Sequence, residues 1–181
     1  PCPAYKFTHV SDFDTNGYLH WVGTKGNTQA YQNPQRRGAV RTDASSEDRN
    51  YFAGAHSFVQ GKEWDGKQNR TKDNAGPNQW LSVAMLNGDA FEVNHYCLRH
   101  GNSNGWNRLR SWELQGREGD SAGWVTLCKH TNDQALADKG FATAGWAVEG
   151  GKGSFSQFRV LQTGPNSDGN NHLMCAGLEL Y

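Results

Sequence analysis

Short runs in which apolar and polar side chains alternate recur along the chain, at residues 18–23, 39–44, 79–86, 91–100, 109–116, 124–130, 142–149, 155–162 and 173–181. A period of two is typical of a half-buried β-strand, because successive side chains point to opposite faces of a sheet. Turn-forming pairs such as Asn16-Gly17, Asn87-Gly88 and Gly164-Pro165 punctuate the runs. Strands at this spacing, without helices of ten or more residues between them, predict an all-β antiparallel sandwich or barrel.

Two stretches do not show this alternating strand pattern. Residues 44–78 contain no clear strand, yet they include Tyr51, Phe52 and Phe58 among many polar residues. A long segment of this kind inside a domain is usually a functional loop, and its aromatic residues favour an ordered loop partly tucked under the sandwich. Residues 135–139 are predicted to form at most one helical turn.

The length and composition fit one domain over residues 1–181. The N-terminus lacks an initiator Met and a signal-peptide pattern, so we expect the chain to be a piece of a larger multidomain protein. Isoleucine is absent, whereas there are seven Trp, six Tyr and eight Phe. Aromatic rings must therefore fill much of the core, and those left at the surface are candidates for contact with a ligand.

Charge and cysteine usage limit the partners and the cellular location that we expect for this protein. Eighteen basic residues balance eighteen acidic ones without a block of like charge, and there is no apolar run of about twenty residues, so neither nucleic acid nor membrane insertion is favoured. Cys2, Cys97, Cys128 and Cys175 lack CxxC spacing, which argues against a zinc site and a disulfide framework. Reduced thiols predict a cytoplasmic location; the glycosylation-type triplet Asn69-Arg70-Thr71 points weakly the other way.

Several blocks of sequence carry a resemblance to a known family. They are FDTNGYLHWVGT at 13–24, YCLRHG at 96–101, LRSWELQG at 109–116 and the closing GLELY at 177–181. In this order, and over nearly the whole chain, they resemble the discoidin-like (coagulation factor 5/8 type C-like) galactose-binding-domain fold, closest to the version in plant BTB/POZ proteins and some HECT-type ubiquitin ligases. The resemblance implies an eight-stranded jelly-roll β-sandwich whose termini are neighbours and whose loops at one end meet ligands.

Carried over by position, those loops are residues 47–54, 64–74 and 101–108. We expect ligand contacts from side chains in or beside them, namely Arg49, Tyr51, Trp64, Arg99, His100, Asn104, Trp106 and Arg108. The chain departs from the family at the strand 79–85, QWLSVAM, where paired tryptophans and an acidic residue are common. The family's own ligand contacts therefore do not transfer directly.

Trp106 is the most informative of these residues, because it stands in the glycine- and asparagine-rich loop NSNGWNR at 102–108. An indole on such a loop can stack on a sugar face or anchor a protein interface. The alternative is that it folds back onto the rim of its own domain. Arg99, His100 and Arg108 could supply hydrogen-bond donors around it.

The segment 12–17, DFDTNG, has the D-x-D-x-N-G opening of a calcium loop, with Asp12, Asp14 and Asn16 as candidate ligands. The twelfth position of such a loop would be Gly23 instead of a bidentate Glu. An Asx-type turn capped by Gly17 is therefore the favoured interpretation, with a structural calcium ion as the alternative and no other cofactor.

The sequence contains no assembled catalytic set. It has no HExxH or H-x-H cluster, no G-x-S-x-G elbow and no glycine-rich phosphate cradle. The pattern predicts a non-catalytic recognition module that binds a protein or peptide within a larger intracellular protein of the ubiquitin pathway. A carbohydrate-binding, lectin-type domain is the alternative, and a scaffold that contacts neighbouring domains of the same chain is a third.

Overall fold

The computed structural model describes residues 6–48, 50–61, 65–73 and 76–181. These residues form eight strands, β1 (Val40–Ala44), β2 (Trp80–Met85), β3 (His95–His100), β4 (Trp112–Arg117), β5 (Val125–His130), β6 (Thr143–Ala147), β7 (Gln157–Gln162) and β8 (Cys175–Leu180). A short α-helix, α1 (Tyr18–Gly23), and a 3-10 helix, η1 (Ala55–Val59), complete the described elements. Neither of these helices has the length or apolar character that crossing a bilayer requires.

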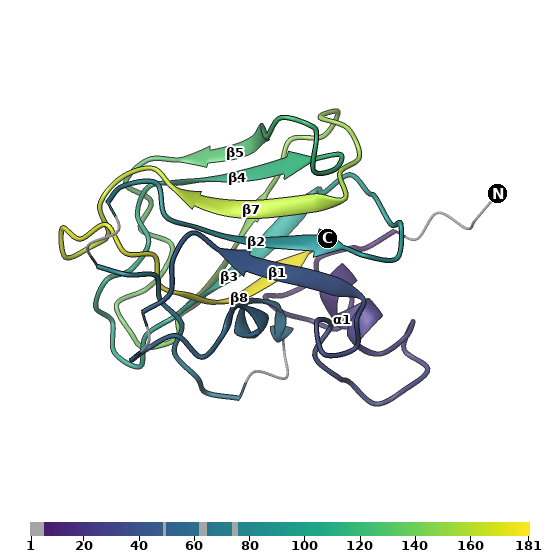
Figure 1. Cartoon of the computed structure of the whole chain (residues 1–181), viewed down its shortest axis with the longest axis horizontal. Coiled ribbons are helices and arrows are strands. Elements are labelled where there is room, and N and C mark those ends of the chain that lie inside the picture. Colours follow the sequence, from purple (N-terminus) through teal and green to yellow (C-terminus); the bar gives the residue numbers. More distant parts are fainter. Residues whose placement is uncertain (1–5, 49, 62–64, 74–75) are drawn as a thin grey trace.

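The strands form two antiparallel sheets, and this confirms the predicted all-β sandwich. Five strands pair in the order β1-β2-β7-β4-β5, which Figure 1 shows from bottom to top, and three pair in the order β6-β3-β8. Burial alternates along β1, whereas β3 and β8 are buried at nearly every position because both of their faces are covered. Each strand overlaps one of the predicted runs. The run at residues 18–23 is the exception.

Aromatic side chains fill the core, as the composition predicted. The largest fully buried side chains include Trp112, Tyr96, Tyr181, Phe58 and Phe158, and they belong to one cluster contributed by both sheets. Burial of each such ring stabilises the fold by roughly 2–3 kcal/mol before entropy is counted. A few rings thus replace the aliphatic side chains that the sequence lacks.

The expectation of a strand at residues 18–23 is wrong, since these residues form α1. The carboxylate of Glu179 on β8 accepts the backbone N–H groups of Leu19 (2.7 Å) and His20 (3.1 Å). An acceptor at this position satisfies donors that the first turn of a helix leaves unpaired. The acceptor is 160 positions away in sequence, which is why the local pattern missed the helix.

The N-terminal segment and α1 cover the outer face of the three-stranded sheet. Phe13 lies over the Arg99 guanidinium of β3, with 4.2 Å between the guanidinium carbon and the ring centroid. The His9 ring centroid is 5.1 Å from that of Tyr181, so residues near the two ends of the chain are neighbours, as the resemblance implied.

The long loop between β1 and β2 is ordered where it is described. Phe58 and Val59 of η1 are fully buried, whereas Tyr51 is 47% exposed. This confirms a loop partly tucked under the sandwich. The helical turn considered for residues 135–139 does not form; Leu136 anchors that segment instead, with only 2% of its surface exposed.

Candidate functional site

The three loops that the resemblance pointed to meet at one end of the sandwich, on the left of Figure 1. The backbone N–H of Asp48 donates to the carbonyl of Arg70 at 3.4 Å, and that of Asn69 donates to the carbonyl of Gly101 at 3.1 Å. The Gln68 side chain reaches the Ser103 hydroxyl at 2.7 Å. We call this surface the loop rim: residues 48, 50–52, 65–73, 101–108 and 166–174.

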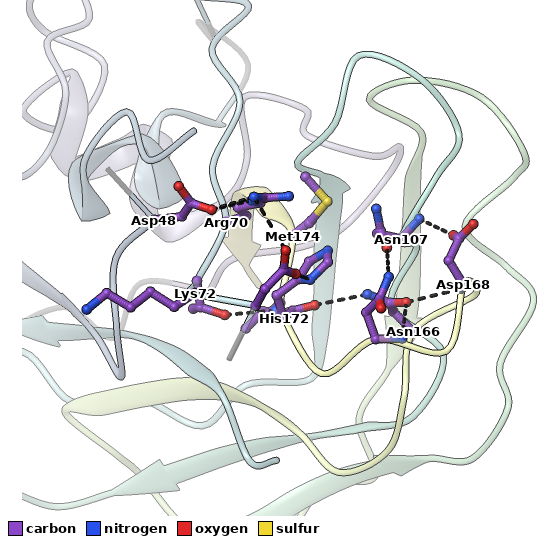
Figure 2. A network of polar contacts seen from close by, with 12 residues as sticks. Asp48, Arg70, Lys72, Asn107, Asn166, Asp168, His172 and Met174 are labelled. Carbon is purple, nitrogen blue, oxygen red and sulfur yellow. Dashed lines mark hydrogen bonds and ion pairs between the residues drawn. The ribbon is translucent and has the colours of Figure 1, made fainter. Parts of the chain in front are cut away.

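The last of these segments, residues 166–174, was not predicted as part of the site. It joins β7 to β8, and Figure 2 shows it beside Asn107 and Arg70. The Asn170 amide donates to Asn107 Oδ1 at 2.8 Å, and Met174 forms an isolated β-bridge with Arg70. The run NSDGNN at 166–171 is typical of a surface turn, but its partners are more than fifty residues away.

Arg70 organises one side of the rim. Its Nε donates to Asp48 Oδ2 at 2.8 Å, and its guanidinium carbon lies 4.2 Å from the centroid of the Tyr51 ring. Burial alone would raise the pKa of Asp48, but the Arg70 hydrogen bond and the nearby backbone N–H of Asn50 lower it below its ordinary value. Tyr51 is thereby held in place while almost half of its surface faces solvent.

Trp106 stands on the other side of the rim with 65% of its surface exposed. Hydrogen bonds hold the backbone of its loop: the Trp106 N–H donates to Asn104 Oδ1 at 2.9 Å, and the Asn102 amide donates to the Trp106 carbonyl at 3.4 Å. At Gly105 a Cβ would overlap Asp138, so glycine is required for the loop to approach residues 138–139. Of the two positions considered for this indole, the exposed one is found.

Most of the other predicted contact residues either fall outside the described residues or are withdrawn from solvent. Arg49 and Trp64 fall outside the described residues. Arg99 is 7% exposed and its Nη1 donates to the Gly61 carbonyl at 2.7 Å, while His100 is fully buried. Consecutive residues of a strand point to opposite faces, and both faces of β3 are covered, so a ligand cannot reach either side chain.

Arg108 is also largely withdrawn from solvent. Its side chain is 13% exposed and forms an ion pair with the exposed carboxylate of Asp138. Asn104 remains at the surface. Of the predicted contact residues that are described, Tyr51, Asn104 and Trp106 therefore form the accessible part of the rim.

The segment 12–17 forms the predicted Asx-type turn. Asp14 Oδ1 accepts the N–H of Asn16 at 2.8 Å, and Oδ2 accepts those of Val10 (2.8 Å) and Ser11 (3.0 Å). Both oxygens of Asp14 are thus used by backbone donors. Asp12 points elsewhere, toward His9 and Cys97.

One arrangement that the sequence did not reveal has the outline of a nucleophile, base and acid. Cys128 Sγ lies 3.2 Å from His130 Nε2, and His130 Nδ1 lies 2.9 Å from Asp133 Oδ2. The Tyr96 hydroxyl also contacts His130 Nε2, at 2.7 Å. Burial raises the pKa of the Cys128 thiol, whereas an activated cysteine has a lowered one. The arrangement fits a polar network of the core.

A second surface feature lies on the outer face of the five-stranded sheet. There a hollow of about 180 Å³ is lined by residues that include Trp80, Arg117, Trp124 and Arg159. The Arg117 and Arg159 guanidinium carbons are 4.5 and 4.4 Å from the Trp124 ring centroid. Trp124 is therefore engaged within its own domain, in contrast to Trp106.

No family model matches the chain. Three proteins are similar over almost all of it: the E3 ubiquitin-protein ligase hecd-1 of Caenorhabditis elegans (34% identity, 98% of this chain, 6% of the ligase), the E3 ubiquitin-protein ligase Ufd4 of Drosophila melanogaster (31%, 98%, 6%) and a BTB/POZ domain-containing protein of Arabidopsis thaliana (28%, 97%, 22%). The chain thus spans a small part of each of these relatives.

Solved structures with the same fold include carbohydrate-binding modules. A family 32 module of Clostridium perfringens NanJ in complex with galactose has a TM-score of 0.60 at 15% identity and covers 82% of this chain and 96% of its own. A chitosan-binding module from a Paenibacillus chitosanase/glucanase has a TM-score of 0.59 at 16% identity and covers 79% and 95%. At these identities the likeness concerns the fold.

Proposed function

Because this chain has the discoidin-like galactose-binding-domain fold and is similar over nearly all its length to segments of ubiquitin-protein ligases, we propose that it is a non-catalytic module that binds a protein or peptide through the loop rim. In this proposal it serves a larger protein of the ubiquitin pathway. The sandwich holds the rim loops in place, so little ordering entropy is lost on association.

The observation that carries the proposal is the presentation of Trp106. With 65% of its surface open to solvent on a hydrogen-bonded loop, the indole is available for contact with a partner, and it lines none of the hollows identified among the described residues. Exposed Trp residues are common anchors that fill a pocket in a protein partner, whereas sites for small ligands are concave. Tyr51, braced by Arg70, offers a second aromatic contact.

Two further features support a reducing compartment and hence a protein of the cell interior. Cys97, Cys128 and Cys175 are free thiols. Asn69, the acceptor of the glycosylation-type triplet, is fully buried, and a glycan cannot be attached to a side chain enclosed by the fold.

A peptide selection followed by calorimetry tests the proposal. Peptides are selected from a random library on the immobilised 181-residue chain, and their Kd is then measured for the chain, for Trp106→Ala and for Trp124→Ala. We expect Trp106→Ala to weaken binding about 30-fold, corresponding to about 2 kcal/mol, with an unchanged melting temperature. Trp124→Ala, the matched control on the sheet face, should bind as the parent does. Equal affinity of Trp106→Ala and the parent would refute a role for the rim.

The second candidate function is carbohydrate binding, favoured by the modules that share the fold and by the two exposed rings of the rim. Aromatic faces stack on sugar rings, so Trp106 and Tyr51 would serve this function as well. A glycan array that includes galactose and chitosan oligosaccharides separates the two. A signal on the array that Trp106→Ala abolishes, together with a failed peptide selection, would establish the alternative.

A further inference from the structure

At the end of the sandwich opposite the loop rim, four potential metal ligands converge from two distant parts of the chain. His9 and Asp12 belong to the N-terminal segment, and His95 and Cys97 belong to β3. The Nε2 or Nδ1 atoms of the two histidines and the Cys97 Sγ all lie within 4.8 Å of one another. We propose that His9, His95, Cys97 and Asp12 form a zinc-binding site that fastens the N-terminal segment to the three-stranded sheet.

Two of the distances from Asp12 match a tetrahedral shell. Asp12 lies outside the group of ligand atoms that are all within 4.8 Å of one another, however, so its carboxylate has to move toward His95 to complete the shell. Asp12 Oδ1 is 3.6 Å from His9 Nε2 and 3.5 Å from Cys97 Sγ. Around a tetrahedral zinc ion, two nitrogen or oxygen ligands are about 3.3 Å apart, and a sulfur and an oxygen ligand are about 3.5 Å apart. Two imidazoles, one thiolate and one carboxylate are donors that zinc prefers, whereas imidazole and thiolate are poor ligands for hard cations such as calcium.

The histidine ring nitrogens that face this cluster form no hydrogen bonds with the described residues. His9 Nε2 and His95 Nε2 are both buried and have no hydrogen-bond partner among the described residues. A buried nitrogen without a partner is costly, and a bound cation would remove that cost. The two rings stack with 3.6 Å between centroids and 12° between their planes. Because a metal ion lies in the plane of the imidazole that binds it, one of the two rings has to rotate before both nitrogens can coordinate one ion.

Gly145 of β6 keeps space open beside the ligands. It pairs with Cys97 in the sheet, and a Cβ at this position would lie 2.7 Å from His95 Nε2, 2.8 Å from Asp12 Oδ1 and 2.9 Å from Cys97 Sγ. Any side chain at position 145 would thus fill the point on which three of the four ligands converge. The spacing His95-x-Cys97 places both ligands on the outer face of β3, since residues two apart share a face.

Zinc would replace a proton at this site. The Cys97 Sγ lies 3.5 Å from Asp12 Oδ1, so a proton on the sulfur can be donated to this carboxylate when no cation is bound. Coordination requires the thiolate, and binding therefore releases a proton and strengthens as the pH rises. Because the ion would bridge residue 9 to residue 97, it would stabilise the folded chain in proportion to its affinity.

Cobalt(II) substitution tests the site on the 181-residue chain after treatment with EDTA and a non-thiol reductant. We expect one equivalent of Co²⁺ to produce a thiolate-to-metal charge-transfer band and the intense visible bands of tetrahedral coordination. Zn²⁺ should displace it and raise the melting temperature. His9→Ala should weaken the metal affinity more than about 100-fold, since even residues that only support a ligand contribute 10- to 100-fold.

Two control variants remove a histidine and a cysteine that lie outside the proposed metal site. His56→Ala removes a half-buried histidine outside the cluster, and Cys128→Ser removes a half-buried thiol outside it; both should leave the cobalt spectrum unchanged. Cys97→Ser should abolish the charge-transfer band. If that variant does not fold, Asp12→Asn at an exposed position and His9→Ala at a half-buried one carry the test. Absence of the band in the parent chain, or equal affinity in His9→Ala, would refute the site. Neither result bears on the loop rim, because Trp106 is not involved.

Discussion

The Oε1 atom of Glu179 accepts a hydrogen bond from the backbone N–H of Leu19 at 2.7 Å, and so joins the last strand to the first helix. The same fully buried carboxylate accepts the N–H groups of His20 and Leu180, each at 3.1 Å. Replacement by alanine would leave three buried donors unpaired. We expect Glu179→Ala to lower the free energy of unfolding by about 3 kcal/mol or more in urea titrations.

The Glu179→Gln variant separates the effect of the hydrogen bonds on stability from the effect of ionising the carboxyl group. Burial raises the pKa of Glu179 to about 8, against the effect of the three N–H donors. A carboxyl whose pKa is higher in the folded than in the unfolded chain stabilises the fold fully below about pH 4.5, and this contribution is lost as the pH rises through about 8. The stability of the parent should therefore fall relative to that of Glu179→Gln between these pH values; a constant difference would contradict the raised pKa.

Gly17, which precedes α1, is predicted to be irreplaceable for reasons of space. Its φ of −76° suits any residue, but a Cβ would overlap the Cδ and Oε1 atoms of Glu179. Gly17→Ala should lower the melting temperature measurably and weaken the contact between α1 and β8. Gly123→Ala is the control, because a Cβ there meets no atom within 4 Å and φ is not positive. Equal melting temperatures of the two variants would show that the helix shifts without cost.

These contacts explain how much of the fold the sequence could predict. The strands were predictable because short apolar runs bounded by turn residues are local signals, although β3 and β8 are buried on both faces and do not alternate in burial. Helix α1 was not, since its acceptor comes from Glu179. The exposure of Trp106 was one of two alternatives that the sequence left open, because a glycine- and asparagine-rich loop supplies no core around the indole but does not prevent it from folding back onto the rim. Arg99 and His100 were misplaced, because the layers that cover the two faces of β3 come from segments far away in sequence.

Arg70 is predicted to hold the Tyr51 side of the loop rim. It donates to Asp48 and lies over the Tyr51 ring, and hydrogen bonds to charged groups contribute about 1.5–3 kcal/mol. Arg70→Ala should therefore speed hydrogen exchange of the Tyr51 and Phe52 amides, whose N–H groups donate to the Asp48 carbonyl at 3.0 and 2.7 Å. Lys72→Ala, at an exposed neighbouring position, should leave both rates unchanged. Slow exchange in Arg70→Ala would mean that the loop holds its shape without the ion pair.

His100 links the stability of the rim to pH. Its ring is fully buried, and the backbone of Asn104 and Trp106 in the 101–108 loop lies beside it. Burial, together with the positive charge of Arg108, lowers the pKa of His100 from 6.5 to about 4. A histidine whose pKa is lower in the folded chain stabilises the fold above about pH 6.5, and this contribution is lost as the pH falls through about 4.

The change should amount to roughly 3 kcal/mol in the free energy of unfolding between pH 6.5 and pH 4, since each pKa unit corresponds to about 1.4 kcal/mol. Urea titrations of the parent and of His100→Gln isolate the contribution of His100 to the free energy of unfolding, because the remaining histidines and carboxylates are common to both proteins. The parent should lose stability more steeply than the variant on acidification, and NMR titration of the His100 ring should show no protonation at pH 6. Protonation near pH 6.5 would mean that solvent reaches this ring and that the 101–108 loop opens above it.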